Sequence, residues 1–368
     1  MTNYPRYGRA RNILGILYAS QGHYEQAAEM IRSAIAERPD VNIYFGNMVN
    51  YLIAQQRLDE AREMIAQIHA RKLDDFVLRL ALYELDFEKA DEAGMNEQLQ
   101  WFADRPEAAF YGLSIASDTA AYRGRLLQAR EVTVRAADAA TRADSKEYAG
   151  INLELAAIRE AAYGNRAQGL QDAAAGLKFD AESQAVRVMA GIALAMGGDA
   201  ARANALVEEL NRQYPADTQM QLLWLPAIRG QIALERKNPG AAIDELRAAL
   251  PAIEYGQIGF ASNMSCLYHT YIRGQAYLAA GEGTAAAAEF QKILDHRGIV
   301  WNCWTGALAH LGVARANALE AHKLQGADAD IARRRSLAAY KDFLTLWKDG
   351  DPDVPVFQEA KAEYAKLQ

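Results

Sequence analysis

The sequence has few of the residues that build sheets, disulfide frameworks or metal sites. Of its 368 residues, 9 are proline and 2 are cysteine, at Cys266 and Cys303. Two thiols are too few for a disulfide framework or a four-thiolate metal site. A metal site that combines them with His269 and His310 is the alternative to burying both as small apolar side chains. No alternation of β-branched residues is bounded by hairpin turns, so we expect no sheet.

Strong positive charge and long apolar runs are also missing. The formal net charge is -7, whereas a nucleic-acid binder gains most of its affinity from basic groups that contact phosphates. No apolar run approaches the roughly 20 residues that span a bilayer. The first residues, MTNYPRYGRAR, have no apolar core of the kind found in secretion signals. We therefore expect no nucleic-acid partner, no membrane insertion and a cytoplasmic location.

The residues that are abundant favour helices. Hydrophobic residues make up 51% and charged residues 24% of the chain, with alanine, leucine, glutamate and arginine prominent. The stretch 14–40, LGILYASQGHYEQAAEMIRSAIAERPD, sets small and large residues in a fixed order. Gly15 and Ala27 are small, as is needed where two antiparallel helices approach closely. We expect Gly22 to end the first helix of this pair and Pro39 to end the second.

The same spacing recurs along the chain and resembles the tetratricopeptide repeat, a helix–turn–helix unit of about 34 residues. For example, Gly274, Tyr277, Gly281, Ala286 and Phe290 repeat the order of the first unit. The resemblance implies an all-α fold, an α-α superhelix (TPR solenoid) of about nine helical hairpins with a C-terminal capping helix. In such an array the first helix of each hairpin lines a concave face, and the second lies outside.

One solenoid is expected over 1–368. It comprises N-terminal hairpins over 5–106, middle hairpins over 107–217, C-terminal hairpins with longer loops over 218–351 and the capping helix over 352–368. Two irregular segments, EYGQIGFASN and HRGIVWNCWTG, lengthen loops between the later hairpins.

A narrower resemblance lies near the C-terminus. The stretches AAAAEFQKILDHRGIV, GALAHLGVARA and YKDFLTLWKDGDPDVP look like the repeat region of large bacterial signalling proteins. There the region commonly follows a serine/threonine protein kinase-like domain or a winged-helix domain. The resemblance implies a role in bacterial signalling or complex assembly, with room for an upstream effector domain in a longer protein. If that region follows a membrane span, the alternative location is outside the cytoplasm.

No catalytic motif is recognisable. The sequence has no P-loop, no G-x-G-x-x-G after a strand and no set of kinase motifs. The acidic run at 349–353, DGDPD, fails as a calcium loop because Val354 and Ala360 stand where glycine and glutamate are needed. We interpret it as a turn in which Asp351 or Asp353 caps the final helix, with prolines at its entry. The prediction is therefore that the chain is not an enzyme and needs no cofactor and no metal.

The repeat register predicts which side chains face the concave surface. Asparagine carboxamides both donate and accept hydrogen bonds, which suits recognition of a peptide backbone, and aromatic rings add contact area at low entropic cost. Part of a Lys/Asn/Arg carboxylate clamp is also present. The predicted partner contacts are Arg9, Asn12, Asn47, Asn50, Arg79, Tyr83, Tyr111, Asp118, Trp224, Gln231, Tyr268, Tyr271 and Gln275.

The expected function is that of a non-catalytic scaffold that binds a peptide or protein segment on this concave face. The alternative is a small-molecule-sensing regulatory domain of a larger kinase-like or transcriptional regulator. Its pocket would lie between later hairpins, around Trp224, Tyr271, Trp301 and Trp304.

Overall fold

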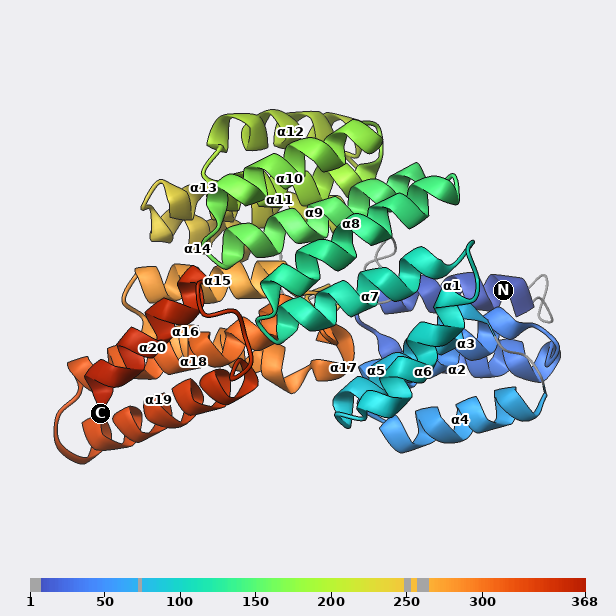
Figure 1. Ribbon diagram of the computed structural model, residues 1–368, viewed down its shortest axis with the longest axis horizontal. Helices are drawn as coiled ribbons and strands as arrows, with labels where there is room; N and C mark the ends of the chain where they lie inside the picture. The colour runs from blue at the N-terminus through green and yellow to red at the C-terminus, as the bar shows by residue number, and fades with distance from the viewer. Residues whose placement is uncertain (1–7, 72–74, 248–252, 257–264) are drawn as a thin grey trace. The chain divides into compact units, whose positions relative to one another are not determined.

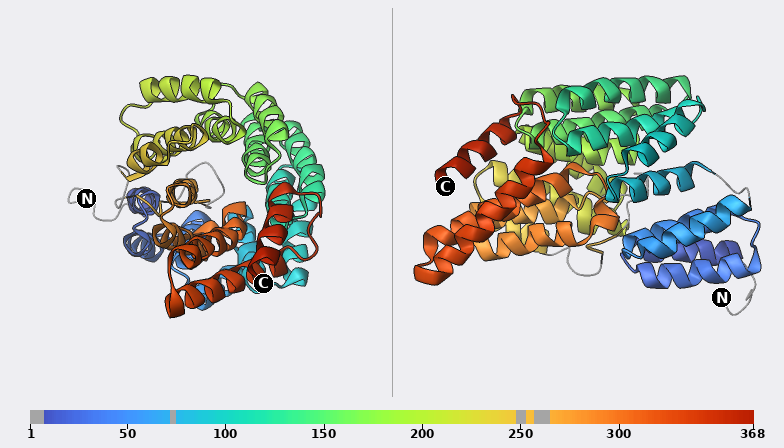
Figure 2. Two further views of the ribbon diagram at one scale, coloured as in Figure 1. Left: turned by 90° about the vertical axis from the view of Figure 1, so that its left-hand side faces the viewer. Right: turned by 60° about the horizontal axis from the view of Figure 1, so that its bottom comes forward.

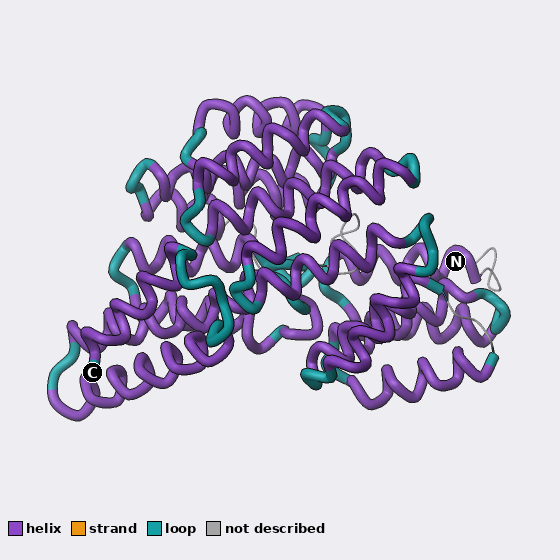
Figure 3. Tube along the Cα trace, viewed as in Figure 1, coloured by secondary structure: helices purple, strands orange, loops and turns teal. Residues whose placement is uncertain are grey.

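A computed structural model describes residues 8–71, 75–247, 253–256 and 265–368. All regular elements in these ranges are helices, and no strand occurs in them (Figure 3). The prediction of an all-α fold is therefore confirmed. None of the helices in the described ranges is both long enough and apolar enough to cross a membrane.

The described helices pair into nine hairpins followed by one C-terminal helix, as the sequence predicts (Figure 1). We call the earlier helix of each pair the first helix and the later one the second helix. The pairs are α1 (Gly8–Ser20) and α2 (Tyr24–Glu37), α3 (Asn42–Ala54) and α4 (Leu58–Ala70), α5 (Phe76–Glu88) and α6 (Glu92–Ala103), α7 (Ala109–Tyr122) and α8 (Leu126–Arg142), α9 (Lys146–Ala162) and α10 (Arg166–Phe179), α11 (Gln184–Gly197) and α12 (Ala200–Gln213), α13 (Leu225–Glu235) and α14 (Pro239–Arg247), α15 (Tyr268–Ala279) and α16 (Gly283–Asp295), and α18 (Trp304–Lys323) and α19 (Gly326–Leu346). A π-helical turn, η1 (Met220–Trp224), precedes α13, a short α17 (Arg297–Val300) precedes α18, and α20 (Pro355–Leu367) is the last helix.

The chain divides into two compact units. Unit 1 comprises Met1–Ala108, Pro251–Cys266 and His296–Trp301, and unit 2 comprises Ala109–Leu250, Leu267–Asp295 and Asn302–Gln368. Unit 1 is therefore built from three hairpins and two segments that come much later in the chain. That both units belong to one solenoid stays a prediction.

Close helix contacts in unit 1 follow the small-residue positions seen in the sequence. A Cβ added at Gly15 of α1 would lie 3.2 Å from the carbonyl oxygen of Ala27 and 3.2 Å from Ile31 in α2. Any larger residue at Gly15 would push these helices apart. Helix α1 ends at Ser20, before Gly22, and α2 ends at Glu37, before Pro39, as the sequence predicts.

The two irregular segments are part of the packing of unit 1. Tyr24 donates its hydroxyl hydrogen to the carbonyl oxygen of Tyr255 at 2.7 Å, and Arg297 lies 3.4 Å from the Glu88 carboxylate. Gly298 lies so close to the carbonyl oxygen of Ile53 that no side chain fits between them. Residues 257–263 of the first segment lie outside the described residues. The described parts are thus bound to the hairpins of unit 1.

In unit 2 the first helices form a continuous inner layer. Each of α7, α9, α11, α13, α15 and α18 contacts the next, and α18 also contacts α7. The last of these contacts is reinforced by Asn302, whose Nδ2 donates to the carbonyl oxygen of Ile115 at 2.9 Å. Figure 2 shows the hairpins from α7 to α14, green to yellow, following one another around a curve. The first helices of unit 2 therefore close into a ring.

Candidate functional site

The ends of four first helices in unit 2 surround a cavity of about 270 Å³. The last turns of α9, α11, α13 and α15 form its wall, and α18 and α20 complete it. Three of the predicted partner contacts, Gln231, Tyr271 and Gln275, line this cavity. The ring of first helices thus brings Gln231 together with Tyr271 and Gln275, which lie 40 and 44 residues later in the chain.

Arginine–glutamate pairs border the cavity. Arg166 contacts Glu235 with nitrogen–oxygen distances of 2.8 and 3.1 Å. Arg315 contacts Glu363 at 2.9 Å and Glu359 at 3.0 Å, and so ties α18 to α20. These two arginines and three glutamates sum to one net negative charge. The rim of the cavity is therefore polar but has no strong net sign.

Tyr271 is held as a neutral phenol at the cavity wall. Burial raises the pKa of Tyr271 to about 12, although the nearby Arg315 guanidinium opposes that rise. Its hydroxyl oxygen accepts a hydrogen bond from Nε2 of Gln275 at 3.1 Å. At neutral pH the pair offers both donors and acceptors to a polar ligand.

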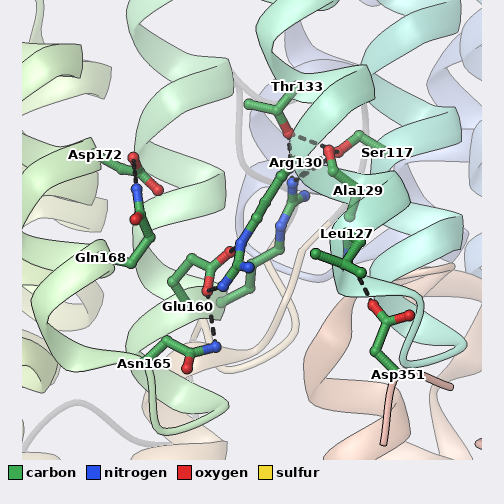
Figure 4. A network of polar contacts seen from close by, with 11 residues as sticks. Ser117, Leu127, Ala129, Arg130, Thr133, Glu160, Asn165, Gln168, Asp172 and Asp351 are labelled. Carbon is green, nitrogen blue, oxygen red and sulfur yellow. Dashed lines mark hydrogen bonds and ion pairs between the residues drawn. The ribbon is translucent and has the colours of Figure 1, made fainter. Parts of the chain in front are cut away.

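Buried charges hold the helices of the cavity wall in place. Arg159 of α9 donates to Asp118 of α7 at 3.0 Å and to the Ser117 hydroxyl at 2.7 Å. Burial raises the pKa of Asp118 to about 6, and the Arg159 guanidinium counteracts that rise. Figure 4 shows the neighbouring pair, in which Arg130 of α8 donates two hydrogen bonds to Glu160 of α9. Both contacts join α9 to the preceding hairpin, so they hold the last turn of α9 in position against α7 and α8.

The turns between first and second helices share one backbone geometry in eight of the hairpins. The chain reverses through a residue with positive φ, whose N–H and the next N–H donate to carbonyl oxygens in the last turn of the first helix. At Gly198, for example, these bonds reach Ala195 at 3.1 Å and, from Asp199, Leu194 at 2.8 Å. The positive-φ residues are Gly22, Gln56 and Ala90 in unit 1 and Gly124, Gly164, Gly198, Lys237 and Gly281 in unit 2.

Two consecutive turns of unit 2 bind a non-helical segment, residues 347–354, and the start of α20. The Trp347 ring covers Gly124, and its Nε1 donates to the carbonyl oxygen of Tyr122 at 2.9 Å. The Pro355 ring covers Gly164, and the N–H of Val356 donates to the carbonyl oxygen of Tyr163 at 3.1 Å. The turns of this array therefore serve as docking points for chain segments.

The structure contradicts our interpretation that an aspartate of the acidic run caps α20. Val354 occupies the N-cap position of α20 and makes no side-chain cap, so neither Asp351 nor Asp353 caps that helix. Instead, Asp351 accepts a hydrogen bond from the N–H of Leu127 at 2.7 Å, at the start of α8 (Figure 4). Helix α8 has no side-chain cap of its own at Arg125, which explains why an acid from elsewhere is used. Pro355 does occupy the entry of α20, as predicted.

The predicted contacts in unit 1 lie on α1, α3 and α5. Asn47 donates to the carboxamide oxygen of Asn12 at 2.9 Å, Arg79 donates to Gln98 of α6 at 2.9 Å, and Arg9 is exposed. Asn50 and Tyr83 are buried. Because Asn12 and Arg79 have partners within unit 1, the arrangement gives no support to a carboxylate clamp.

In unit 2 the remaining predicted contacts pack against neighbouring side chains, with Trp224 and Tyr268 buried and Tyr111 and Asp118 half-buried. Asp118 faces Arg159, and Tyr111 packs edge-on against Tyr148 with ring centroids 5.0 Å apart. Tyr268 fills the space between Trp224, at 6.2 Å, and Trp304, at 5.9 Å. The fourth residue of the small-molecule alternative, Trp301, belongs to unit 1 and donates its Nε1–H to the carbonyl oxygen of Gly298. Contact of these residues with a partner stays a prediction.

The sequence reasoning missed the arginines of the site. Arg159 carried a usable signal, since it lies within the apolar stretch LAAIREAAYG, where a charge needs a buried partner. Arg166 and Arg315 carried none, because their glutamates come from helices that are distant in the chain.

The described ranges contain no set of side chains that could bind a metal ion. No group of three or more histidine, cysteine, aspartate or glutamate side chains there could hold a metal ion. Cys266 and Cys303 are both buried, and neither is a free thiol.

No protein-family model and no curated protein matches the sequence. Among solved structures, a tetratricopeptide repeat protein from Parabacteroides merdae is 13% identical, with 84% of this chain and 98% of that chain covered and a TM-score of 0.35. Yeast Tom70 is 10% identical, with 99% and 89% covered and a TM-score of 0.44. The TPR domain of P58(IPK) is 13% identical, with 98% of both chains covered and a TM-score of 0.28.

Proposed function

We propose that the chain is a non-catalytic interaction module that holds a segment of a partner protein in the cavity of unit 2. The observation that carries this proposal is the binding of residues 347–356 to the turns at Gly124 and Gly164. That segment leaves the turns where α20 begins, and Val356 and Glu359 of α20 line the cavity. A partner segment would thus take the next position along the same set of turns.

The polar groups of the cavity suit a peptide backbone. Gln231 and Gln275 each carry a carboxamide, which donates and accepts at once, and the Tyr271 phenol adds a further donor. A volume of about 270 Å³ lies just below the range of about 300–1,000 Å³ that is usual for drug-sized ligands. It suits a short stretch of chain or one or two side chains.

The charges favour a binding role over a catalytic one. Glu235 and Glu359 at the cavity lie in ion pairs with Arg166 and Arg315, so neither is poised as a free general acid or base. The same pairing leaves little positive charge for a phosphate backbone, in keeping with the net charge of -7. The role in bacterial signalling that the sequence resemblance implies stays a prediction.

Selection from a phage-displayed library of random 16-residue peptides tests the proposal. We expect wild-type protein to enrich peptides whose affinity falls at least about ten-fold, or about 1.4 kcal/mol, for a Gln231→Ala/Gln275→Ala variant. The matched control is Gln168→Ala/Gln291→Ala, which removes two carboxamides from second helices outside the cavity. It should bind as wild type does.

Equal binding to both double variants would place the peptide elsewhere and contradict the proposal. Enrichment of no peptide at all by wild type would also contradict it. In that case, a rise in melting temperature with small metabolites that disappears in Gln231→Ala/Gln275→Ala would favour the small-molecule alternative.

A further inference from the structure

The turns with a positive-φ glycine are of two kinds. In a covered turn, atoms from a distant part of the chain pack against the glycine; in an open turn, they do not. In unit 1, Gly22 is covered by the backbone of Tyr255, which would lie 3.2 Å from an added Cβ. In unit 2, an added Cβ would lie 2.5 Å from the Trp347 ring at Gly124 and 2.8 Å from Pro355 at Gly164. Each of these three turns is thus covered by a distant part of the chain, by backbone at Gly22 and by the ring of a tryptophan or a proline at Gly124 and Gly164.

The turn at Gly198 has the same geometry but no such cover. Its φ of 91° lies close to the 99° of Gly164, and its two backbone hydrogen bonds match those of the other turns. Among the described residues, chain neighbours aside, the only heavy atom within 4 Å of an added Cβ is Nη1 of Arg166, at 3.8 Å. The remaining glycine turn of this kind, at Gly281, receives a hydrogen bond from Lys323 on its carbonyl oxygen.

The open turn lies at the cavity of the proposed function. Met196, two residues before Gly198, lines the cavity, and so does Arg166. The carbonyl group of Gly197 holds the same turn position as that of Tyr163, which accepts the N–H of Val356. A segment docked on Gly198 would therefore find an acceptor at the turn and the carboxamide of Gln231 beyond it.

We propose that Gly198 anchors the partner segment by packing against one proline or aromatic residue of it, and that the chain beside this residue enters the cavity. This inference rests on the proposed function and names the residue type that the site selects. A ring fits because the two covered turns of unit 2, at Gly124 and Gly164, each hold one at a glycine where no side chain intervenes. The partner is thus a protein segment with an exposed proline or aromatic ring.

The helix after the open turn shows which residue the partner does not need. At Gly124, the docked segment also supplies Asp351, which caps α8. Helix α12 has its own cap, because Asp199 accepts a hydrogen bond from the N–H of Arg202 at 3.0 Å. An acidic residue four positions after the ring, as in the Trp347–Asp351 pair, is consequently not required.

The peptides selected from the library on wild-type protein are the probe. We expect them to share a proline or an aromatic residue, and replacement of that residue by alanine should weaken binding at least about ten-fold. Gly198→Asn should cause a loss of similar size, because asparagine tolerates positive φ while its side chain fills the docking point. Gly326→Asn makes the same change at a positive-φ glycine of the α18–α19 turn, whose chain neighbours do not line the cavity, and should bind as wild type does.

Hydrogen exchange on wild-type protein gives a second measurement that does not depend on a variant folding. Bound peptide should slow exchange of the amides of residues 196–200 at least about three-fold. Selected peptides without a common ring, or unchanged exchange at these amides, would overturn the anchor. Undiminished binding to a folded Gly198→Asn variant would also do so. If the Gln231→Ala/Gln275→Ala variant still loses binding in these cases, the proposed function stands without the anchor; if it does not, both fall.

Discussion

At the scale of single residues, the buried charges of this protein are of two kinds. Arg159 is paired through both terminal nitrogens of its guanidinium, which bond to side chains of α7 and α8, while its Nε has no hydrogen-bond partner among the described residues. Glu84 of α5 is fully buried, and its carboxyl oxygens have no hydrogen-bond partner among the described residues. Burial raises the pKa of Glu84 well above its ordinary value; Glu88 raises it further and Arg297 lowers it. The folded state therefore favours the protonated acid.

Replacing Glu84 should reveal this preference as a pH dependence of stability. A carboxyl whose folded pKa exceeds its unfolded pKa keeps its proton longer in the folded state. The free energy of unfolding therefore falls as pH rises above the unfolded value near 4.5. The slope is at most about 1.4 kcal/mol per pH unit. Urea titrations between pH 5 and 8 should show that Glu84→Gln loses this component, so that its stability relative to wild type increases with pH.

The exposed Glu63 provides the control for this experiment. Glu63→Gln removes a carboxylate from α4 in the same unit without altering a buried group, so its curve should run parallel to that of wild type. Parallel curves for Glu84→Gln and wild type would show that the acid is not a source of the pH dependence.

At the scale of helices, what could be predicted depends on the range of the interaction. The end of α1 before Gly22 and the fit of Gly15 against Ala27 follow from local spacing, and the sequence predicted them. The cap at Asp351 could not be predicted in this way. An aspartate caps whichever helix start lies within reach, and Leu127 is 224 residues away in the chain.

The two aspartates of this run separate the two interpretations. Asp351→Ala should lower the free energy of unfolding by about 1 kcal/mol, the usual cost of a lost cap, because the N–H of Leu127 loses its acceptor. Asp353→Ala removes an exposed acid in the same run and should change it by less than about 0.5 kcal/mol. Urea denaturation measures both, and faster amide exchange at the start of α8 should accompany only the first. Equal effects of the two substitutions would contradict a cap on α8.

At the scale of the whole chain, the candidate site was partly predictable. The repeat register placed Gln231, Tyr271 and Gln275 on one face, and they do share a cavity. Arg315 escaped prediction because its place at the cavity depends on α20 folding back. The docking of the irregular segments could not be predicted for the same reason. Their sequences indicate that they are irregular but not which hairpin they bind. Local patterns therefore determine the hairpins, whereas long-range docking determines what their turns bind.

Gly298 tests whether the late segments stabilise the early hairpins. A side chain at this position would collide with the backbone of Ile53 at the end of α3, which cannot move as a flexible side chain would. Gly298→Ala should therefore lower the free energy of unfolding of unit 1 by about 1–3 kcal/mol, the usual cost of overpacking. Hydrogen exchange should become faster both at residues 296–301 and at the end of α3, about 240 residues earlier in the chain.

The control is Gly240→Ala, at the second residue of α14, where an added Cβ meets, among the described residues, only Asn238, at 3.9 Å. Alanine there should be neutral, or stabilising by up to about 1 kcal/mol, since it favours helix over glycine. If Gly298→Ala accelerates exchange only around residue 298 and leaves α3 unchanged, residues 296–301 bind to unit 1 without stabilising its early hairpins. If α3 responds as well, the first hairpins depend on a segment that is synthesised long after them, so unit 1 cannot be complete until about residue 301 has left the ribosome.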